Sequence, residues 1–564
     1  MPQGRRKVPF SGKAKKLQLQ MKRQGQTSKS SVLLKTTQSQ SEDDSNCQKI
    51  DFHASQNNRN TSRYALKFNK ESDAELKKQK EFGRAALEIR DHKALEIEEH
   101  DYFKNLDFPK RPPWNYNMSL EEIQKSEHRY FTEYVTELEK SHENLSYFEL
   151  NLETWRQLWR VLEMSDIILT ITDIRYPSLM FPPYLYEYVT KELKKQMIFI
   201  LNKVDLVPAP LVCAWYNHFK DKYPEMHILL FTSYPGYNVV RGSAKKTGLK
   251  SRKLKGRPQM STEGAECLLA ACKTIVKDAV DLSSWEQKIK EEKNSSSNTE
   301  ELEIETVINQ QTQDTAFVEH ELYKNGILTI GCIGQPNVGK SSLMNALMGK
   351  KVVSVSKTPG HTKHFQTIFL TDTVRLCDCP GLVFPSLVPR YIQVLMGSYP
   401  ISQLRETFST LRFVAERLDL PKLLHLIHPD GDEEWSPYNI CEAWAIKRGF
   451  LTARAARPDI HRAGINLLQM CLSGVICLKL KPPHYKEMKG QWEVHKDLPE
   501  IHKIQARTNQ QEVDDEIDSE DFSENDDDEV NDETKTIPKD QNADEDSSDS
   551  ELPAIQNKFA ALMD

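Results

Sequence analysis

The sequence contains few of the features that mark secreted or membrane-spanning proteins. Its 564 residues include only ten cysteines, and no two of them form a Cys-x-x-Cys pair, which argues against a disulfide framework and a zinc ribbon. The longest apolar runs, such as Met197–Leu201, are far shorter than the roughly 18 residues of a membrane-spanning helix. No signal-peptide run follows the basic N-terminus. We therefore expect a cytoplasmic or nuclear protein, the nucleolus included, with no membrane partner.

Apolar residues are also scarce, because they make up only 38% of the chain. The formal charge of -6 conceals two strongly charged ends: residues 1–40 contain ten Lys and Arg without any Asp or Glu, whereas residues 511–555 contain twenty acidic residues and two lysines. Such segments cannot bury enough apolar surface to offset the conformational entropy that ordering costs. We predict a disordered basic arm at 1–62 and a disordered acidic tail at 506–564.

Short apolar runs alternate with helical patterns between residues 155 and 391. We interpret the runs as buried strands at Ile167–Ile171, Ile198–Leu201, His227–Phe231, Ile327–Ile333 and Val374–Leu376. Helices are expected between them, at Tyr184–Leu193, Leu211–Tyr223 and Glu266–Val280. This alternation predicts an α/β domain with a mostly parallel sheet and helices on both faces. A polar stretch, 288–318, predicts a disordered linker inside the domain, and helical patterns predict additions at 63–154 and 392–505.

The strongest motif is a phosphate-binding loop, G-x-x-x-x-G-K-[ST], at residues 334–341. A predicted strand leads into it and a helical pattern leaves it, as this motif requires. Its glycines let backbone N–H groups surround phosphate oxygens, Lys340 places a charge on the outer phosphates, and the Ser341 hydroxyl can ligate Mg²⁺. The candidate phosphate-binding residues are Gly334, Gln335, Pro336, Asn337, Val338, Gly339, Lys340, Ser341 and Ser342.

Two further motifs follow predicted strands and indicate which nucleotide binds. In Asp378-Cys379-Pro380-Gly381, the carboxylate can hold a water on Mg²⁺ and the glycine N–H can sense a terminal phosphate.

The second motif, Asn202-Lys203-Val204-Asp205, suits recognition of a base. A carboxylate in this position can accept both N–H groups of the guanine edge, which adenine does not offer, and the Lys203 stem can cover the base. Either short motif alone is common and could be a solvated turn. With the phosphate loop in the same chain, the three predict a site for GTP or GDP with Mg²⁺.

The order of the motifs is unusual, because the base motif precedes the phosphate loop by about 130 residues. This order resembles that of the circularly permuted GTPases of the YlqF/YawG family, which includes ribosome-assembly proteins of bacteria and eukaryotes. The resemblance rests on the segments Asp173-Ile-Arg175, 202–205, 334–342, 354–367 and 378–381. It implies a circularly permuted P-loop GTPase domain at 155–391, with GTP hydrolysis as the activity.

Some site residues are implied only by this resemblance. It favours Thr362 over Thr358 as the switch threonine, so that Ser341, Thr362 and Asp378, the last through a water, would hold Mg²⁺. For the second base loop, Ser233 ends a predicted strand, whereas Ser243-Ala244-Lys245 has the more familiar residues without a strand before it. We favour Ser233.

The catalytic residue is not identified by the sequence. Leu382 occupies the position of the usual water-orienting glutamine and cannot hydrogen-bond a water. The resemblance therefore implies slow hydrolysis, or hydrolysis that depends on a partner or a monovalent cation. Asn337 matches the position that helps to hold potassium in some such enzymes, although an asparagine here can equally serve only the turn.

Basic segments suggest a partner beyond the nucleotide. Arg241–Arg257 has eight Lys and Arg among seventeen residues and no acid, so it can bind RNA phosphates or a pre-ribosomal particle, as can the N-terminal arm. A solvated loop is the plainer interpretation. Serines beside carboxylates in the acidic tail are candidate phosphorylation sites.

Three hypotheses remain for the function. The first is a guanine-nucleotide switch with slow hydrolysis and an unidentified protein activator, acting in ribosome-related or regulatory processes. The second is an RNA or ribosome-assembly binding factor in which GTP is only a gate. The third is a degenerate GTP binder without turnover, which the leucine at 382 allows.

Overall fold

A computed structural model describes the central part of the chain and a few short strands on either side of it. The described residues are 73–90, 95–115, 117–142, 145–233, 261–294, 321–350, 352–353, 366–432, 434–452, 456–505 and the strands at 49–51, 67–69, 239–241, 252–254 and 308–309. The predicted acidic tail and most of the predicted basic arm lie outside them. Three residues of that arm, β1 (Lys49–Asp51), pair antiparallel with β2 (Lys67–Asn69). Disorder of the basic arm and of the acidic tail stays a prediction.

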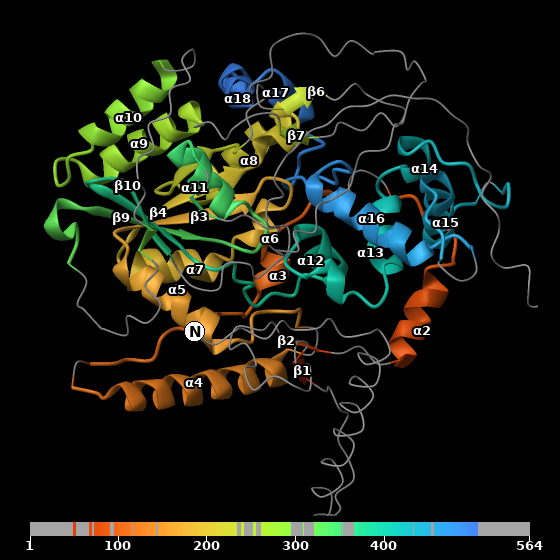
Figure 1. The fold of residues 1–564 in the computed structure, drawn as a ribbon, viewed down its shortest axis with the longest axis horizontal. Helices are drawn as coiled ribbons and strands as arrows, with labels where there is room; N and C mark the ends of the chain where they lie inside the picture. The colour runs from red at the N-terminus through yellow and green to blue at the C-terminus, as the bar shows by residue number, and fades with distance from the viewer. Residues whose placement is uncertain are drawn as a thin grey trace, which may run out of the picture. The chain divides into compact units, whose positions relative to one another are not determined.

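A seven-stranded sheet forms the centre of the described structure (Figure 1). In order across the sheet, its strands are β5 (His227–Leu230), β4 (Gln196–Asn202), β3 (Ile167–Asp173), β9 (Leu328–Ile333), β11 (Val374–Asp378), β10 (Gln366–Thr371) and β8 (Ile308–Asn309). The first five are mutually parallel, whereas β10 runs antiparallel to both neighbours. The predicted parallel sheet and its five strands are therefore confirmed.

Strand β10 was not predicted. It joins β11 through a two-residue connection at 372–373, which is Asp-Thr. This pair lacks the glycine or asparagine that usually marks a tight hairpin, so the sequence carries no turn signal at that point.

Apolar side chains on the two faces of the sheet enter two separate cores. Ile167, Leu169 and Ile171 of β3 belong to one core, whereas Ile168 belongs to the other, as the alternation of side chains along a strand requires. The first core takes in α9 (Thr262–Val276), α10 (Ser283–Asn294) and α11 (Lys340–Met348).

The second core covers the opposite face. It takes in α5 (Leu152–Met164), α7 (Pro183–Glu187) and α8 (Ala209–Lys222). Figure 1 shows α5 and α7 on one side of the sheet and α9, α10 and α11 on the other. Helices on both faces therefore bury the near-continuous apolar strands, as predicted for a parallel sheet.

Helix α10 corrects the prediction of a disordered linker from residue 288. The helix continues to Asn294, and Trp285 and Ile289, one turn apart on it, are 0% and 1% exposed. Burial of these two apolar side chains offsets the conformational entropy that is lost when an otherwise polar helix becomes ordered. Strand β8 also lies within the predicted linker, and the remainder of 288–318 is outside the described residues.

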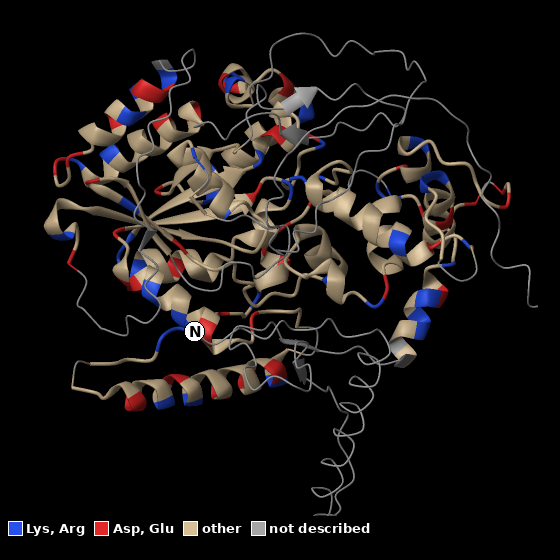
Figure 2. Ribbon diagram, viewed as in Figure 1, with Lys and Arg blue, Asp and Glu red and all other residues tan. Residues whose placement is uncertain are grey.

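The predicted helical addition before the domain is partly helical. Its helices are α2 (Asp73–Phe82), α3 (His100–Phe103) and α4 (Leu120–Ser141). Helix α4 starts at a capping box between Ser119 and Glu122 and buries Phe131, Val135 and Leu138. Figure 2 shows Lys and Arg interspersed with Asp and Glu along α4, as on a solvated helix face.

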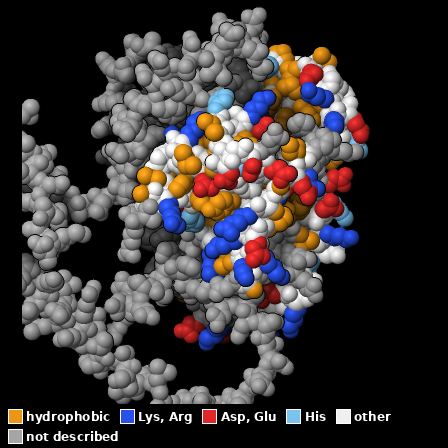
Figure 3. Space-filling view, turned by 90° about the vertical axis from the view of Figure 1, so that its right-hand side faces the viewer, with side chains coloured by type: hydrophobic (Ala, Val, Ile, Leu, Met, Phe, Trp, Pro, Cys, Tyr) orange, Lys and Arg blue, Asp and Glu red, His pale blue; other side chains and the backbone are white. Residues whose placement is uncertain are grey.

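After the sheet the chain is helical, as predicted. These helices are α12 (Arg390–Met396), α13 (Phe408–Ala415), α14 (Leu420–Leu423), α15 (Pro437–Arg448), α16 (Ile460–Ser473), α17 (Lys489–Glu493) and α18 (Leu498–Ile504). Asp459 caps the start of α16, and Gly474 ends it in the left-handed conformation, with φ of 80°. Figure 3 shows apolar, acidic and basic side chains intermixed on the face of the molecule at the right of Figure 1.

The remaining elements are short. They are α6 (Pro177–Met180), the π-helical turn η2 (Tyr188–Glu192), the 3-10 turns η3 (Val204–Leu206), η5 (Lys324–Gly326) and η6 (Ile401–Gln403), and the antiparallel pair β6 (Val239–Arg241) and β7 (Arg252–Leu254). Within the described residues, none of the helices has the length and apolar character needed to cross a bilayer.

Candidate guanine-nucleotide site

The phosphate loop lies between β9 and α11 and passes very close to its neighbours. Gly334 and Gly339 have positive φ values of 153° and 99°. A Cβ on Gly334 would lie 2.4 Å from the Ile171 carbonyl oxygen, and one on Gly339 would lie 2.5 Å from the Asn202 side chain. Only glycine fits these two positions, so the motif spacing has a direct structural cause.

Lys340 and Ser341, which are predicted to bind phosphate and metal, lie in the first turn of α11. The Lys340 ammonium is buried and donates to the carbonyl oxygens of Gly334 and Gln335 at 3.0 and 2.8 Å. Burial lowers the pKa of Lys340, while Asp378 opposes this shift. The Ser341 hydroxyl donates to Oδ2 of Asp378 at 3.2 Å. The structure thus brings the phosphate loop and the Asp-x-x-Gly motif together.

Asp378 fits a magnesium site. Its side chain is fully buried, and its Oδ1 atom has no hydrogen-bond partner among the residues that the structure describes. Burial raises the pKa of this carboxyl to about 6, although Lys340 and Ser341 act in the opposite direction. A hydrated cation beside Oδ1 would supply the missing partner and favour the ionised form.

The segment after Asp378 lies against the phosphate loop. A Cβ on Gly381 would lie 2.8 Å from Cα of Pro336, and the backbone N–H of Leu382 donates to the Gly334 carbonyl at 3.3 Å. The Leu382 side chain is 1% exposed and belongs to the core that contains α5 and α8. It is therefore held in a core and contributes no polar atom to the site.

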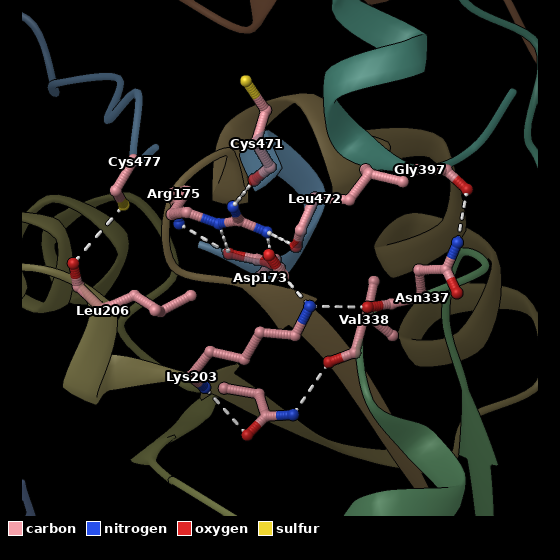
Figure 4. Close-up of polar contacts among 12 residues, drawn as sticks. Asp173, Arg175, Lys203, Leu206, Asn337, Val338, Gly397, Cys471, Leu472 and Cys477 are labelled. Carbon is pink, nitrogen blue, oxygen red and sulfur yellow. Dashed lines mark hydrogen bonds and ion pairs between the residues drawn. The ribbon is translucent and has the colours of Figure 1, made fainter. Parts of the chain in front are cut away.

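The Asn-Lys-x-Asp motif is also bonded to the phosphate loop. Asn202 donates through Nδ2 to the Val338 carbonyl at 2.8 Å. Lys203, with φ of 62°, donates through Nζ to the Asn337 carbonyl at 2.6 Å and to Oδ2 of Asp173 at 2.8 Å (Figure 4). Three strand ends therefore meet at one edge of the sheet, where ligands of open α/β sheets bind.

The carboxylate that is predicted to recognise the base has a partner that the sequence interpretation missed. Oδ1 of Asp205 accepts a hydrogen bond from the Thr232 hydroxyl at 2.8 Å, and Thr232 is 1% exposed. The predicted residue, Ser233, lies next to it, with a buried hydroxyl that has no partner within the described part of the chain. Thr232 and Ser233 directly follow the predicted strand at 227–231. This position was the only sequence signal for a role of Thr232 beside the base motif. The alternative, Ser243 and Ala244, lies outside the described residues.

Asp173 and Arg175 connect the site to the C-terminal helices. The Arg175 guanidinium donates to both carboxylate oxygens of Asp173, at 3.0 and 2.8 Å, and to the Cys471 carbonyl at the end of α16, at 2.8 Å (Figure 4). Arg175 and Lys203 together hold the pKa of the buried Asp173 carboxyl below its usual range, against the effect of burial. The sequence singled out this pair as a motif without assigning its role.

The phosphate loop itself contacts the same C-terminal helical unit. Asn337 donates through Nδ2 to the Gly397 carbonyl at 2.9 Å, and Oε1 of Gln335 accepts from the Ser398 hydroxyl at 2.5 Å. Gly397 ends α12 in the left-handed conformation. A potassium-binding role for Asn337 remains a prediction. Both candidate switch threonines, Thr358 and Thr362, lie outside the described residues.

The fold and this arrangement define the class of protein. A mostly parallel sheet with a phosphate loop between β9 and α11 is a P-loop GTPase fold, and the chain order, with the base motif first, makes it a circularly permuted one. A family model described as 50S ribosome-binding GTPase matches residues 329–443.

Known relatives specify the family. The chain is 47% identical to guanine nucleotide-binding protein-like 1 of Mus musculus over 468 residues, which cover 79% of this chain and 77% of the relative. The Homo sapiens protein of that name is 46% identical with the same coverage. The Mus musculus large subunit GTPase 1 homolog is 31% identical and covers 70% of this chain and 68% of its own. The chain therefore belongs to the guanine nucleotide-binding protein-like 1 family.

A solved structure was also found to be similar. The GNP-bound YlqF from T. maritima is 18% identical, with a TM-score of 0.32, and the match covers 58% of this chain and 97% of that chain.

Proposed function

We propose that the protein is a guanine-nucleotide switch that binds GTP and GDP with Mg²⁺, hydrolyses GTP slowly and passes its nucleotide state to the C-terminal helices. The observation that carries this proposal is the set of bonds between the phosphate loop and residues 397–398. Gln335 and Asn337 each bond to that segment, so a change in the loop's position on nucleotide binding would strain or release α12. The family membership supports nucleotide binding.

Ser341, Thr362 and Asp378 would hold the magnesium ion, which supplies positive charge to the phosphates when bound. Lys340 would exchange its two backbone acceptors for phosphate oxygens, which gives the buried ammonium a counter-charge. Asp205, oriented by Thr232, would accept the two N–H groups of guanine. Ser341, Asp378, Lys340 and Asp205 support these roles by their common place at the carboxyl ends of the parallel strands, whereas Thr362 lies outside the described residues.

Hydrolysis should be slow because the chain supplies no polar side chain at residue 382, which is buried in a core. Single-turnover hydrolysis by the full chain, measured in sodium and in potassium buffers, tests this point. We expect slow turnover that potassium increases. Lys340→Ala is the control, since loss of the phosphate-binding charge should abolish both GTP binding and turnover.

The result can contradict the proposal in two ways. Unchanged GTP affinity in Lys340→Ala would overturn the assignment of the loop. A wild-type protein that binds GTP but turns over no faster than this variant, in either buffer, would be a nucleotide binder without GTPase activity.

A second function, RNA binding, is favoured by the basic segment Arg241–Arg257. Relatives described as ribosome-binding or large-subunit GTPases are consistent with it. If this segment binds phosphates, the logarithm of RNA affinity should fall linearly with the logarithm of salt, with a slope of about -0.7 to -0.9 per contact. The segment would then link the switch to an RNA or pre-ribosomal particle.

Replacement of lysines in this segment by glutamine tests the RNA proposal. The variant changes Lys245, Lys246, Lys250 and Lys253. A control variant changes the same number of exposed lysines elsewhere, at Lys125, Lys140, Lys290 and Lys293. We expect the first variant to lose affinity and salt dependence and the second to retain most of both. Equal losses in the two variants would mean that the segment has no specific role.

A further inference from the structure

The last described helices support the base-recognition loop from behind. Helices α17 and α18 pack on α8, and Ile501 of α18 is 2% exposed. Beyond α18, the Gln505 side chain donates to the carbonyl oxygens of Val204 and Val207 at 2.8 and 3.0 Å. Val204 lies inside the Asn-Lys-x-Asp motif. An interaction that fixes α17 and α18 on α8 therefore also helps to fix the position of the loop that would recognise guanine.

Three metal-ligating side chains meet at this contact. Cys213 comes from α8, whereas His495 and Asp497 come from the connection between α17 and α18. One ligand atom from each residue lies within 4.8 Å of the other two, and these residues form the one such group found among the described residues. Nδ1 of His495 is 3.5 Å from Oδ2 of Asp497.

These separations are close to those of a tetrahedral zinc site. With bonds of about 2.0–2.1 Å to nitrogen and oxygen and about 2.3 Å to sulfur, neighbouring ligand atoms lie about 3.3–3.6 Å apart. The His495–Asp497 pair already has this spacing. Because all three ligand atoms lie within 4.8 Å of one another, the thiol would need to approach the other two by at most about 1.2 Å to reach the spacing of a tetrahedral zinc site.

Burial around the three residues also suits a metal with three protein ligands. Cys213 is buried, whereas the side chains of His495 and Asp497 are 19% and 35% exposed. The group is therefore closed at the sulfur and open to solvent at the other side, where a water can complete the coordination.

We propose that Cys213, His495 and Asp497 bind a zinc ion that fastens α17 and α18 to α8. A thiolate with an imidazole and a carboxylate is a donor set that favours Zn²⁺ over Mg²⁺ or Ca²⁺. On binding, the sulfur forms a bond to zinc, a metal-bound water leaves, and the thiol proton passes to solvent. The site is distinct from the nucleotide site, and the proposal does not depend on GTP binding.

Cobalt substitution gives a direct test, because a cobalt–thiolate bond produces charge-transfer absorption in the near ultraviolet. The full chain, freed of metal with a chelator and kept without nucleotide or magnesium, is titrated with Co²⁺ and then with Zn²⁺. We expect one equivalent of Co²⁺ to produce the band and Zn²⁺ to remove it. Cys213→Ser should abolish the band and lower Zn²⁺ affinity at least tenfold.

Two further variants keep the test decisive. Cys267→Ser changes another, partly exposed cysteine on α9 and should keep the band unchanged. Asp497→Asn removes a carboxylate that makes no capping hydrogen bond to α18, so it should fold normally and bind Zn²⁺ at least tenfold more weakly. A wild-type protein without the band, or unchanged Zn²⁺ affinity in Asp497→Asn, would overturn the proposal.

Discussion

At the scale of single residues, the site depends on side chains that are held by groups from distant parts of the chain. Lys203 shows this best, because its ammonium bonds to Asp173 and to the Asn337 carbonyl. These two bonds fix the end of the lysine stem that would lie over a base. Thr232 similarly fixes one oxygen of Asp205, which leaves fewer orientations for the carboxylate that would read guanine.

Replacement of Asp205 by asparagine should change the base preference. The substitution turns one carboxylate oxygen into an NH₂ donor and removes the negative charge. One hydrogen bond to guanine is therefore lost and the other is no longer charge-assisted, and a charge-assisted bond is worth about 1.5–3 kcal/mol. We expect GTP affinity to fall by about 100-fold or more and affinity for xanthosine triphosphate to rise, as measured by fluorescent-nucleotide titration.

The matched control for this prediction is Asp221→Asn, which changes an exposed aspartate on α8 and should leave both affinities unchanged. GTP affinity of wild-type strength in Asp205→Asn would contradict the assignment of the base motif.

At the scale of elements, the sheet brings together motifs that are far apart in the chain. Strand β3 pairs with β4 on one side and with β9 on the other, although β9 follows β4 only after α8, β5, α9 and α10. Spatial order therefore does not depend on chain order. A permuted sequence can form the same site at the strand ends, because the place of each strand in the sheet depends on its burial and on the strands it pairs with. Longer connections between the strands add little to the entropy cost of loop closure.

Helix α10 offers a test at this scale. Ile289 is 1% exposed within a polar helix, so Ile289→Ala should lower the free energy of unfolding by roughly 2–5 kcal/mol. Its neighbour Lys290 has a 68% exposed side chain in an ion pair with Glu286. Lys290→Ala should therefore change stability by only about 0.5 kcal/mol.

Urea denaturation of the two variants measures both effects. Similar stability of Ile289→Ala and Lys290→Ala would mean that α10 does not pack on the sheet, and that residues 288–294 belong to the linker after all.

At the scale of the whole molecule, the segment before α5 joins the N-terminal addition to the chain that follows the Asp-x-x-Gly motif. The backbone N–H groups of Ser146 and Glu149 donate to the carbonyl oxygens of Ser386 and Val383, at 3.1 and 3.0 Å. Gln393 of α12 donates to the Tyr147 carbonyl at 2.7 Å. The segment that would sense nucleotide is thus held between the N-terminal addition and the C-terminal helices.

Glu149 should make overall stability depend on pH. Burial raises the pKa of its carboxyl to about 7, against about 4.3 in an unfolded chain. Between these two pKa values, Glu149 is more protonated in the folded state than in the unfolded state. Its contribution to the free energy of unfolding is therefore largest below about pH 4.3 and decreases as the pH rises to about 7. The decrease from this group is about 3 kcal/mol as an order of magnitude.

Glu149→Gln isolates this contribution, because it keeps an oxygen that can accept from the Asn151 N–H and removes the titration. We expect the variant to gain stability relative to the wild type as pH rises from about 4.5 to 8, as measured by urea denaturation. Glu137→Gln, at an exposed position on α4, should retain the wild-type slope. Parallel curves for Glu149→Gln and the wild type would contradict the shift.

Much of the fold was predictable because its signals are local. Five apolar runs predicted the parallel strands, and glycine positions in 334–341 predicted a loop that only glycine can form. Burial, pairing and backbone sterics act on neighbouring residues, so a sequence records them directly. Strand β10 and the end of α10 were not predictable in this way, because one lacks a turn signal and the other depends on two apolar side chains that pack on a distant sheet.

The sequence by itself therefore determined the family resemblance, the motifs and the parallel sheet. The tertiary structure decided which groups meet: Thr232 with Asp205, Arg175 with the end of α16, and Cys213 with His495 and Asp497. The physical reason is that such contacts depend on the packing of helices against a sheet. That packing minimises the exposed apolar area of the whole chain. The residues that it brings together are far apart in the sequence, so no periodic or short-range sequence pattern predicts their contact.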